Sequence, residues 1–137
     1  MQNYLSIYCD GGARGNPGPA AAAFVVEKSG KVIYKESSFL GKATNNTAEY
    51  SAARLALAWL QKQNDIPKQV EVIMDSELVV KQLLGIFKVK NENLRNFYYS
   101  VKSIEKNIPT KIIYKSVPRI KNKIADFLVN ETLDENS

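Results

Sequence analysis

The segment YCDGGARGNPGPAAAAF, residues 8–24, decides how the chain begins to fold. An apolar run ends at Asp10, and glycine and proline crowd the positions that follow. Pro17 and Pro19 exclude a helix start within this cluster. The pattern is neither G-x-G-x-x-G nor a P-loop, because no Lys-Ser/Thr pair follows the glycines and the next segment reads as a strand. The segment therefore predicts strand, turn and strand, and it raises the question of why a carboxylate ends the first strand.

The rest of the chain predicts a meander followed by alternating helices and strands. Residues 47–63 contain no glycine or proline and favour a helix, with Asn45, Asn46 or Thr47 as its cap. We expect strands over residues 3–10, 20–28, 31–39, 70–75 and 110–117, and further helices over 76–84, 92–106 and 124–133. This order predicts an α/β fold, a mixed sheet with helices packed over it. Because no linker or repeat interrupts the pattern, we expect one domain over residues 1–137, with 132–137 as a frayed tail.

Composition excludes several classes of protein. The 137 residues include no histidine, which excludes histidine as a general base or metal ligand. The single cysteine, Cys9, cannot form an internal disulfide. No apolar run is long enough to span a membrane, and the N-terminus lacks the basic and apolar regions of a signal peptide. We expect a cytoplasmic protein that has no membrane association.

Positive charge is concentrated in one part of the chain. The net charge is +5, yet between Lys81 and Lys123 eleven lysines and arginines face only two acids, Glu92 and Glu105. A basic region of this kind is typical of proteins that bind a polyanion such as nucleic acid. A solvated basic surface without a ligand is the alternative, and the charge alone does not choose between them.

Four carboxylates fall at the ends of predicted elements. Asp10 and Asp75 each end an apolar strand, and ligands bind at the carboxyl ends of strands in open α/β sheets. Glu49 and Asp126 fall near the starts of helices, where either could simply interact favourably with the helix dipole. A carboxylate that closes a buried strand is costly to desolvate unless it meets a cation. Without histidine, such a cluster suits Mg²⁺ or Mn²⁺ rather than zinc.

Four segments together resemble the motifs of type 1 ribonuclease H, in the same order and spacing. They are YCDGGARGNPGPAAAAF, TNNTAEYSAARLAL, MDSELVVKQLLG and VPRIKNKIADFLVN, and the resemblance covers residues 3–132. It implies a ribonuclease H-like fold: a five-stranded mixed sheet, with a three-stranded antiparallel meander, two parallel strands and helices on both faces. It also implies an endonuclease that hydrolyses the RNA strand of an RNA–DNA hybrid, leaving 5′-phosphate and 3′-hydroxyl ends.

The resemblance also assigns roles to individual residues. It implies that two Mg²⁺ ions, with Mn²⁺ as an alternative, are held by Asp10, Glu49, Asp75 and Asp126. The implied substrate contacts are Gly11, Gly12, Arg14, Asn16, Thr44, Asn45, Asn46 and Arg119. Each asparagine could equally serve as a turn or cap residue. In this interpretation Asp10 faces the substrate phosphate across the metal ions, which answers the question that its position raises.

The sequence departs from the family pattern at two places. Relatives carry a histidine before the last helix, where this chain has VPRIKNKIAD, and Arg119 cannot accept a proton in its place. Between Lys81 and Asn93 there is no room for the basic insertion of many bacterial members, so we expect weaker, salt-sensitive hybrid binding. We expect Phe87 to be a weak DNA contact and Tyr99 to lie in the core.

Two other functions stay open from the sequence. A related nuclease acting on double-stranded RNA or on DNA would share the fold and the carboxylates. A catalytically inactive domain that only binds nucleic acid would have lost part of the acidic set, and here all four carboxylates stand. The sequence points to no protein partner, and we expect a monomer.

Overall fold

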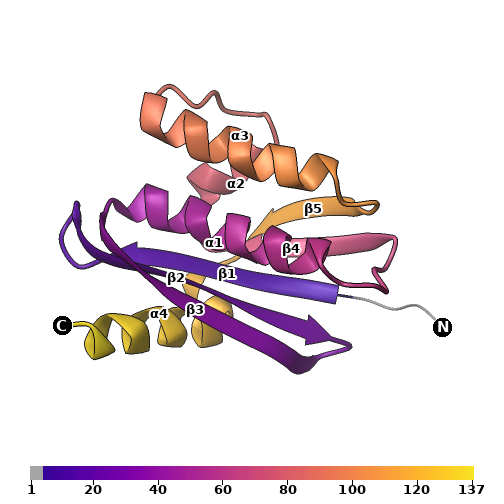
Figure 1. Cartoon of the computed structure of the whole chain (residues 1–137), viewed down its shortest axis with the longest axis horizontal. Coiled ribbons are helices and arrows are strands. Elements are labelled where there is room, and N and C mark those ends of the chain that lie inside the picture. The colour runs from indigo at the N-terminus through magenta and orange to yellow at the C-terminus, as the bar shows by residue number, and fades with distance from the viewer. Residues whose placement is uncertain (1–4) are drawn as a thin grey trace.

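The computed structural model describes residues 5–137, which form a twisted five-stranded sheet with helices on both faces (Figure 1). The strand order is β3-β2-β1-β4-β5. The strands are β1 (Leu5–Ala13), β2 (Gly18–Lys28), β3 (Lys31–Ala43), β4 (Gln69–Met74) and β5 (Lys111–Ser116). The first three strands pair antiparallel, whereas β4 pairs parallel to both β1 and β5. The predicted meander with two parallel strands is therefore confirmed.

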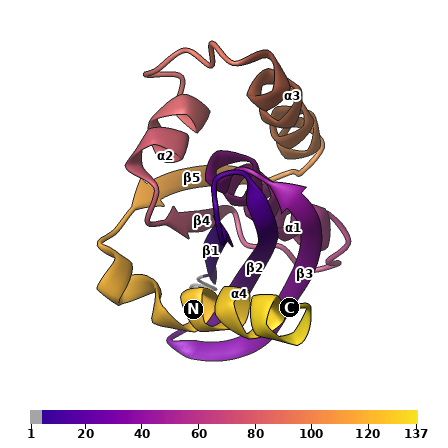
Figure 2. The same ribbon diagram turned by 90° about the vertical axis from the view of Figure 1, so that its left-hand side faces the viewer.

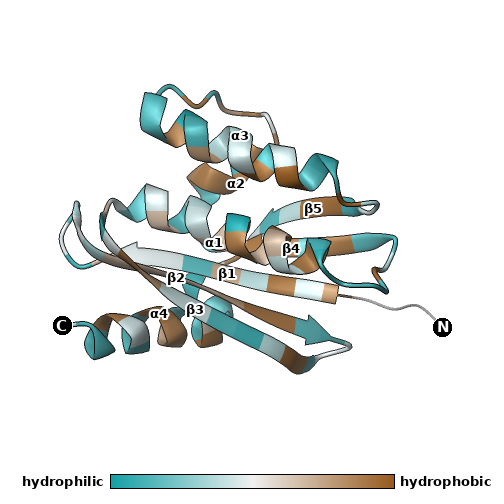
Figure 3. Cartoon of the chain, viewed as in Figure 1, coloured by the Kyte–Doolittle hydropathy of each residue, from teal (hydrophilic) through white to brown (hydrophobic). Residues whose placement is uncertain are grey.

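The helices divide between the two faces of the sheet (Figures 1 and 2). On one side lie α1 (Asn45–Gln61), α2 (Glu77–Leu83) and α3 (Glu92–Lys106). On the other side lies α4 (Lys123–Glu135), which follows the short 3₁₀ turn η1 (Arg119–Asn122). Hydrophilic and hydrophobic residues alternate along α3, as expected for a helix with one buried face (Figure 3). Within residues 5–137, no helix combines the length and apolar character that crossing a membrane requires.

The alanine run of β2 explains how helices cover both faces. Ala20, Ala21, Ala22 and Ala23 are all fully buried in the centre of the meander. Ala22 belongs to the core beneath α1, whereas Ala21 and Ala23 belong to the core beneath α4. Because a strand points successive side chains to opposite faces, small residues let a helix approach closely on each side. A run that favours helix by propensity is therefore a strand through its tertiary surroundings.

The cap of α1 differs from the sequence prediction. Thr44, not one of the three residues after it, is the cap, and its side chain accepts a hydrogen bond from the Thr47 amide at 3.1 Å. Asn45 cannot serve, because its side-chain oxygen accepts a hydrogen bond from the Ala13 amide at 2.8 Å. The Asn45 side chain thus joins the start of α1 to β1, whereas the Thr44 side chain caps the helix.

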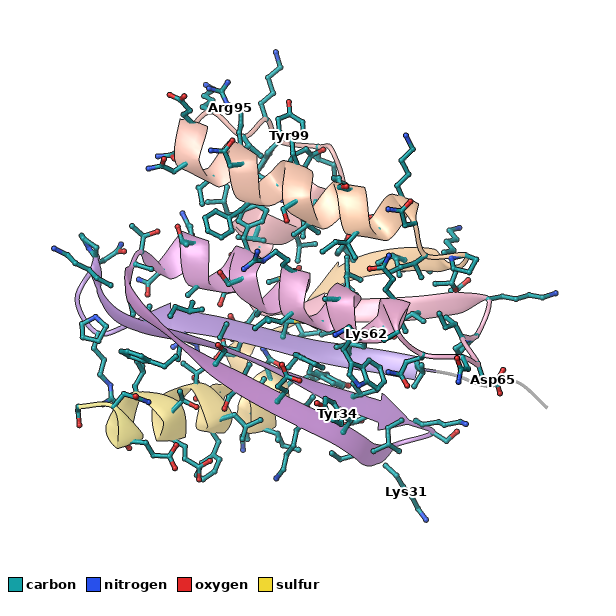
Figure 4. All side chains as sticks on the ribbon, in the orientation of Figure 1. Lys31, Tyr34, Lys62, Asp65, Arg95 and Tyr99 are labelled. Carbon is teal, nitrogen blue, oxygen red and sulfur yellow. The ribbon has the colours of Figure 1, made fainter. Side chains whose placement is uncertain are left out.

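Three further expectations need correction. The predicted frayed tail is wrong up to residue 135, because α4 continues to Glu135 and buries Thr132 and Leu133. The expected core position of Tyr99 is wrong, since it is 63% exposed and projects from α3 into solvent with Arg95 (Figure 4). β1 extends to Ala13, through the first two glycines, rather than ending at residue 10. The start of that predicted strand, residues 3 and 4, lies outside the described residues.

Candidate active site

Three carboxylates from separate elements meet at the carboxyl end of the parallel strands. Asp10 lies in β1, and Asp75 directly follows β4, the parallel neighbour of β1. Glu49 lies near the start of α1. One carboxylate oxygen from each residue lies within 4.8 Å of the other two. All three side chains are nearly inaccessible: Asp10 is 4% exposed, Glu49 6%, and the Asp75 side chain 7%. The two aspartates meet as the sequence predicted.

Gly11 allows α1 to approach β1 closely enough to bring Glu49 into this group. A β-carbon at Gly11 would lie 2.2 Å from the carbonyl carbon of Ala48, far inside any van der Waals contact. In its absence, the Gly11 amide donates a hydrogen bond to Oε1 of Glu49 at 2.6 Å. The first glycine after the strand is therefore required by helix packing, and its amide orients one oxygen of the glutamate.

Mutual repulsion and burial raise the proton affinity of this group. The pKa of Asp10 rises from 3.8 to about 7, chiefly through burial and then through the charge of Asp75. Burial, followed by the charges of Asp10 and Asp75, raises the pKa of Glu49 well above its ordinary value. Three ionised carboxylates at this separation repel one another strongly unless a cation lies between them.

The unpaired oxygens of the group fit a divalent cation. Among the described residues, Oε2 of Glu49 and Oδ2 of Asp75 are buried and have no hydrogen-bond partner. Buried carboxylate oxygens without a donor are costly, and oxygen atoms are the ligands that Mg²⁺ and Mn²⁺ prefer. The Nε of Arg119 lies 3.8 Å from Asp75 Oδ2, too far for a hydrogen bond, and the Arg119 side chain is 77% exposed. The donor set therefore suits a hard metal ion.

Asp126 lies beside this group but not within it. It falls in the first turn of α4 and lines the same cavity, of about 490 Å³, as the other three carboxylates. Its charge contributes to the raised pKa of Asp10. It is not one of the three residues whose oxygens lie within 4.8 Å of one another. All four predicted carboxylates thus line one cavity: three form the close group, and the fourth acts on Asp10 from the start of α4.

Sequence reasoning missed Asn122, which fixes the start of α4. It is 1% exposed, and its Nδ2 donates to the carbonyl oxygen of Cys9 at 2.8 Å. Cys9 directly precedes Asp10, so this bond ties the start of the helix that carries Asp126 to the strand that carries Asp10. No local pattern marks Asn122, since its partner is 113 positions away.

The predicted substrate residues divide into two groups. Those that line the cavity are Gly11, Gly12, Arg14, Asn45, Asn46 and Arg119. Asn16 and Thr44 are not among the lining residues, but both bind the backbone at the start of α1. Asn16 accepts a hydrogen bond from the Asn45 amide at 3.0 Å, and Thr44 caps α1. Contacts between Asn45 and Ala13 and between Asn16 and Asn45 join the loop after β1 to the start of α1.

The connection between α2 and α3 is short, as predicted. It runs from residue 84 to 91 and leaves Phe87 45% exposed, with the Lys81 ammonium 5.2 Å from its ring centroid. This places an aromatic ring next to positive charge on the surface. Phe87 does not line the acidic cavity, which is formed by β1, α1, α4 and the residues that follow β1, β4 and β5.

Comparisons with known proteins identify relatives over almost the whole chain. Residues 2–133 match the family described as RNase H. The chain is 38% identical over 130 residues to the bifunctional protein Rv2228c of Mycobacterium tuberculosis, covering 93% of this chain and 35% of that protein. It is 38% identical over 133 residues to ribonuclease HI of Halobacterium salinarum, covering 96% and 65%. The chain thus spans about a third of the mycobacterial relative and under two thirds of the halobacterial one.

Solved structures of RNase H1 proteins also superpose on this chain. A crystal structure of LC11-RNase H1 in complex with an RNA/DNA hybrid superposes with a TM-score of 0.92 at 40% identity, covering 96% of this chain and 98% of that one. The RNase H1 structure from Halobacterium salinarum superposes with a TM-score of 0.87 at 34% identity, covering 96% and 98%. The fold is therefore shared over 96% of this chain.

Proposed function

The chain belongs to the type 1 ribonuclease H family, and from that premise we propose that it hydrolyses the RNA strand of RNA–DNA hybrids. The relative LC11-RNase H1 has been captured with such a hybrid. The proposed reaction is endonucleolytic and leaves 5′-phosphate and 3′-hydroxyl ends. We further propose that the protein acts as a monomer, since one chain supplies all four carboxylates of the cavity. We also propose a cytoplasmic location, because its single cysteine is free, as suits a reducing compartment.

The observation that carries this proposal is the group of three buried carboxylates whose oxygens lie within 4.8 Å. Two of these oxygens have no hydrogen-bond partner among the described residues, and the pKa of Asp10 is raised to about 7. A fold does not retain such a costly arrangement for stability, and strongly perturbed carboxylates in a cavity are typical of functional sites. A domain that merely bound nucleic acid would not need it.

In this proposal Asp10, Glu49 and Asp75 would hold divalent ions, with Asp126 as an additional ligand. When bound, two Mg²⁺ or Mn²⁺ ions would supply Lewis acidity to activate the attacking water and to neutralise charge on the leaving oxygen. The Gly11 amide keeps Glu49 oriented through its 2.6 Å hydrogen bond. Burial of the carboxylates excludes competing water and strengthens their hold on a cation.

The polar rim of the cavity suits recognition of RNA. Proteins distinguish RNA from DNA through the 2′-hydroxyl, which lies in the minor groove of the hybrid. Asn45 uses its side-chain oxygen to accept from Ala13, and this leaves its Nδ2 to donate to a sugar hydroxyl or base edge. Gly12 and Asn46 line the same wall. Arg119, which is 77% exposed, would contact a phosphate but cannot act as a base.

The test is cleavage of end-labelled duplexes in Mg²⁺ and in Mn²⁺. RNA–DNA hybrid, RNA–RNA and DNA–DNA duplexes of one sequence are compared, with Asp10→Asn as the inactive variant and Asp65→Asn as a matched control that also removes one acidic charge. We expect cleavage of only the RNA strand of the hybrid, loss in Asp10→Asn and full activity in Asp65→Asn. Cleavage of RNA–RNA as well would extend the substrate range. Tight binding of an intact hybrid by all three proteins would refute the enzymatic function.

A further inference from the structure

Arg14 is held by the last helix at the rim of the acidic cavity. Its Nη1 lies 2.7 Å from Oδ1 of Asp134, and its Nη2 donates at 3.4 Å to both the carbonyl oxygen and Oδ1 of Asn130. The partners are 116 and 120 positions away along the chain, near the end of α4. Arg14 also lines the cavity that contains the four carboxylates. The loop after β1 is thus fastened to α4 by one guanidinium.

This attachment has little effect on the stability of the fold. The side chains of Arg14 and Asp134 are 45% and 69% exposed, and exposed ion pairs contribute roughly 0–1 kcal/mol. The contact does, however, select one position for the guanidinium, because an aspartate, an asparagine and the negative end of a helix dipole lie on the same side of it. Its effect is therefore on where Arg14 points.

The separation between Asp10 and Arg14 along the chain is similar in length to the separation between Asp126 and Asp134 in α4. Arg14 directly follows β1 and is four residues beyond Asp10, at most about 13 Å at the rise of a strand. Along α4, Asp134 is eight residues beyond Asp126, about 12 Å at the rise of a helix. β1 and α4 pack against each other with their axes at an angle (Figure 2), and Val129 of α4 lies in van der Waals reach of Gly12. They place a positive charge at a set offset from the metal-binding group.

We propose that Asp134 and Asn130 are positioning residues that hold Arg14 ready to bind a backbone phosphate of the RNA strand. The offset of about 12 Å selects a phosphate near the scissile one, but not the scissile one itself. A guanidinium has five N–H donors, and the contacts with α4 leave at least two for a phosphate. This inference rests on the proposed function, because it takes the hybrid as the ligand.

Positioning and simple electrostatics predict opposite effects when the negative charge is removed. Asp134→Asn makes the protein more positive by one charge, so long-range attraction alone predicts tighter binding of a polyanion. If Asp134 positions Arg14, the same change weakens binding. Asp65→Asn changes the net charge equally, but Asp65 is exposed at the opposite end of the molecule from the end of α4 (Figures 1 and 4). It is the matched control.

The first measurement is hybrid binding by fluorescence anisotropy in EDTA, which needs no chemistry. We expect Asp134→Asn to raise the Kd about two- to fivefold, corresponding to the upper range for an exposed pair, and Asp65→Asn to leave it unchanged or lower it. In Mg²⁺, the KM for the hybrid should rise by the same factor with kcat unchanged. A Kd for Asp134→Asn at or below that of the control would overturn the inference.

A double-mutant cycle then tests whether Asp134 acts through Arg14. Arg14→Gln should weaken binding and lower the dependence of log Kd on log salt by about one phosphate contact. Adding Asp134→Asn to Arg14→Gln should produce no further loss, whereas additive losses would contradict the coupling. If the wild-type chain binds the hybrid without cleaving it, the proposed function fails, yet the anisotropy ratios still decide the role of Asp134.

Discussion

Replacing Asp10 by asparagine is expected to stabilise the metal-free protein at pH 8 and, at the same time, to abolish hydrolysis. In the folded chain Asp10 is 4% exposed and faces the charges of Asp75 and Asp126. Its ionised form is therefore unfavourable in the absence of a cation. Asparagine has nearly the same shape and carries no charge, so it removes the repulsion without creating a cavity.

The magnitude follows from the pKa. The pKa of Asp10 rises from 3.8 in the unfolded chain to about 7 in the fold, so its proton stabilises the fold below pH 3.8, and this contribution is lost as the pH rises through about 7. Each pKa unit corresponds to about 1.4 kcal/mol, so ionisation of Asp10 lowers the free energy of unfolding by at most roughly 4 kcal/mol. Because Glu49 competes for the same proton, we expect Asp10→Asn to raise the free energy of unfolding at pH 8 by roughly 2–4 kcal/mol.

The assay is urea unfolding followed by circular dichroism, in EDTA, at several values between pH 5 and pH 8. The wild-type free energy of unfolding should fall across this range, and the fall should be smaller in Asp10→Asn. Addition of Mg²⁺ at pH 8 should stabilise the wild type, by about 2.7 kcal/mol at a hundredfold excess over Kd, and should not stabilise the variant. Asp65→Asn, on an exposed acid, should keep the wild-type slope.

Two results would refute this reasoning. If Asp10→Asn were less stable than the wild type in EDTA at pH 8, the carboxylate would be making favourable contacts that outweigh its repulsion. If the pH dependence of unfolding were the same in both proteins, Asp10 would not titrate within the range that its surroundings impose.

Three further substitutions test how the site is built. In urea unfolding, Gly11→Ala should lower the free energy of unfolding by about 3 kcal/mol or more, because its methyl group would displace Glu49. Gly12→Ala is the control: its methyl group makes only an ordinary contact, so the free energy of unfolding should fall by less than about 1 kcal/mol. Thr44→Ala should lower it by about 1 kcal/mol through loss of the α1 cap, and Thr44→Ser should restore most of the loss. Asn122→Ala should lower the free energy of unfolding by about 1–3 kcal/mol through loss of the buried hydrogen bond to β1. It should also lower kcat, because the start of α4 is no longer held against β1. An unchanged kcat in steady-state cleavage would contradict a role of Asn122 in positioning α4.

The elements that form locally could be predicted from the sequence, and so could the site residues that lie near their ends. Strand β4 and helix α3 agree with the predicted ranges to within a residue, because apolar periodicity and nearby caps define them. Asp10 and Asp75 could be placed together because parallel strands bring their carboxyl ends to one edge. The residue that caps α1 could not be identified among neighbouring polar residues. The outcome depends on a hydrogen bond from Ala13, 32 positions away in β1, to the side chain of Asn45.

The contacts that could not be predicted from the sequence are mostly those of α4. The core beneath this helix contains fewer buried residues than the core beneath α1, and Ala21, Ala23 and Ala125 are among them, so burial constrains the position of α4 along its axis less strongly. Polar contacts fix that position instead, at the start through Asn122 and near the end through the side chain of Thr132, which donates to Ser37 at 2.7 Å.

The position of α4 along its axis matters because the helix carries Asp126. A shift of one turn, about 5.4 Å, would remove this carboxylate from the cavity that it shares with Asp10. Arg14 joins the same helix to the loop that faces the substrate. The side chains of Arg14 and Asp134 are 45% and 69% exposed, so this contact holds the guanidinium rather than the helix, and its loss should leave Asp126 and kcat unchanged.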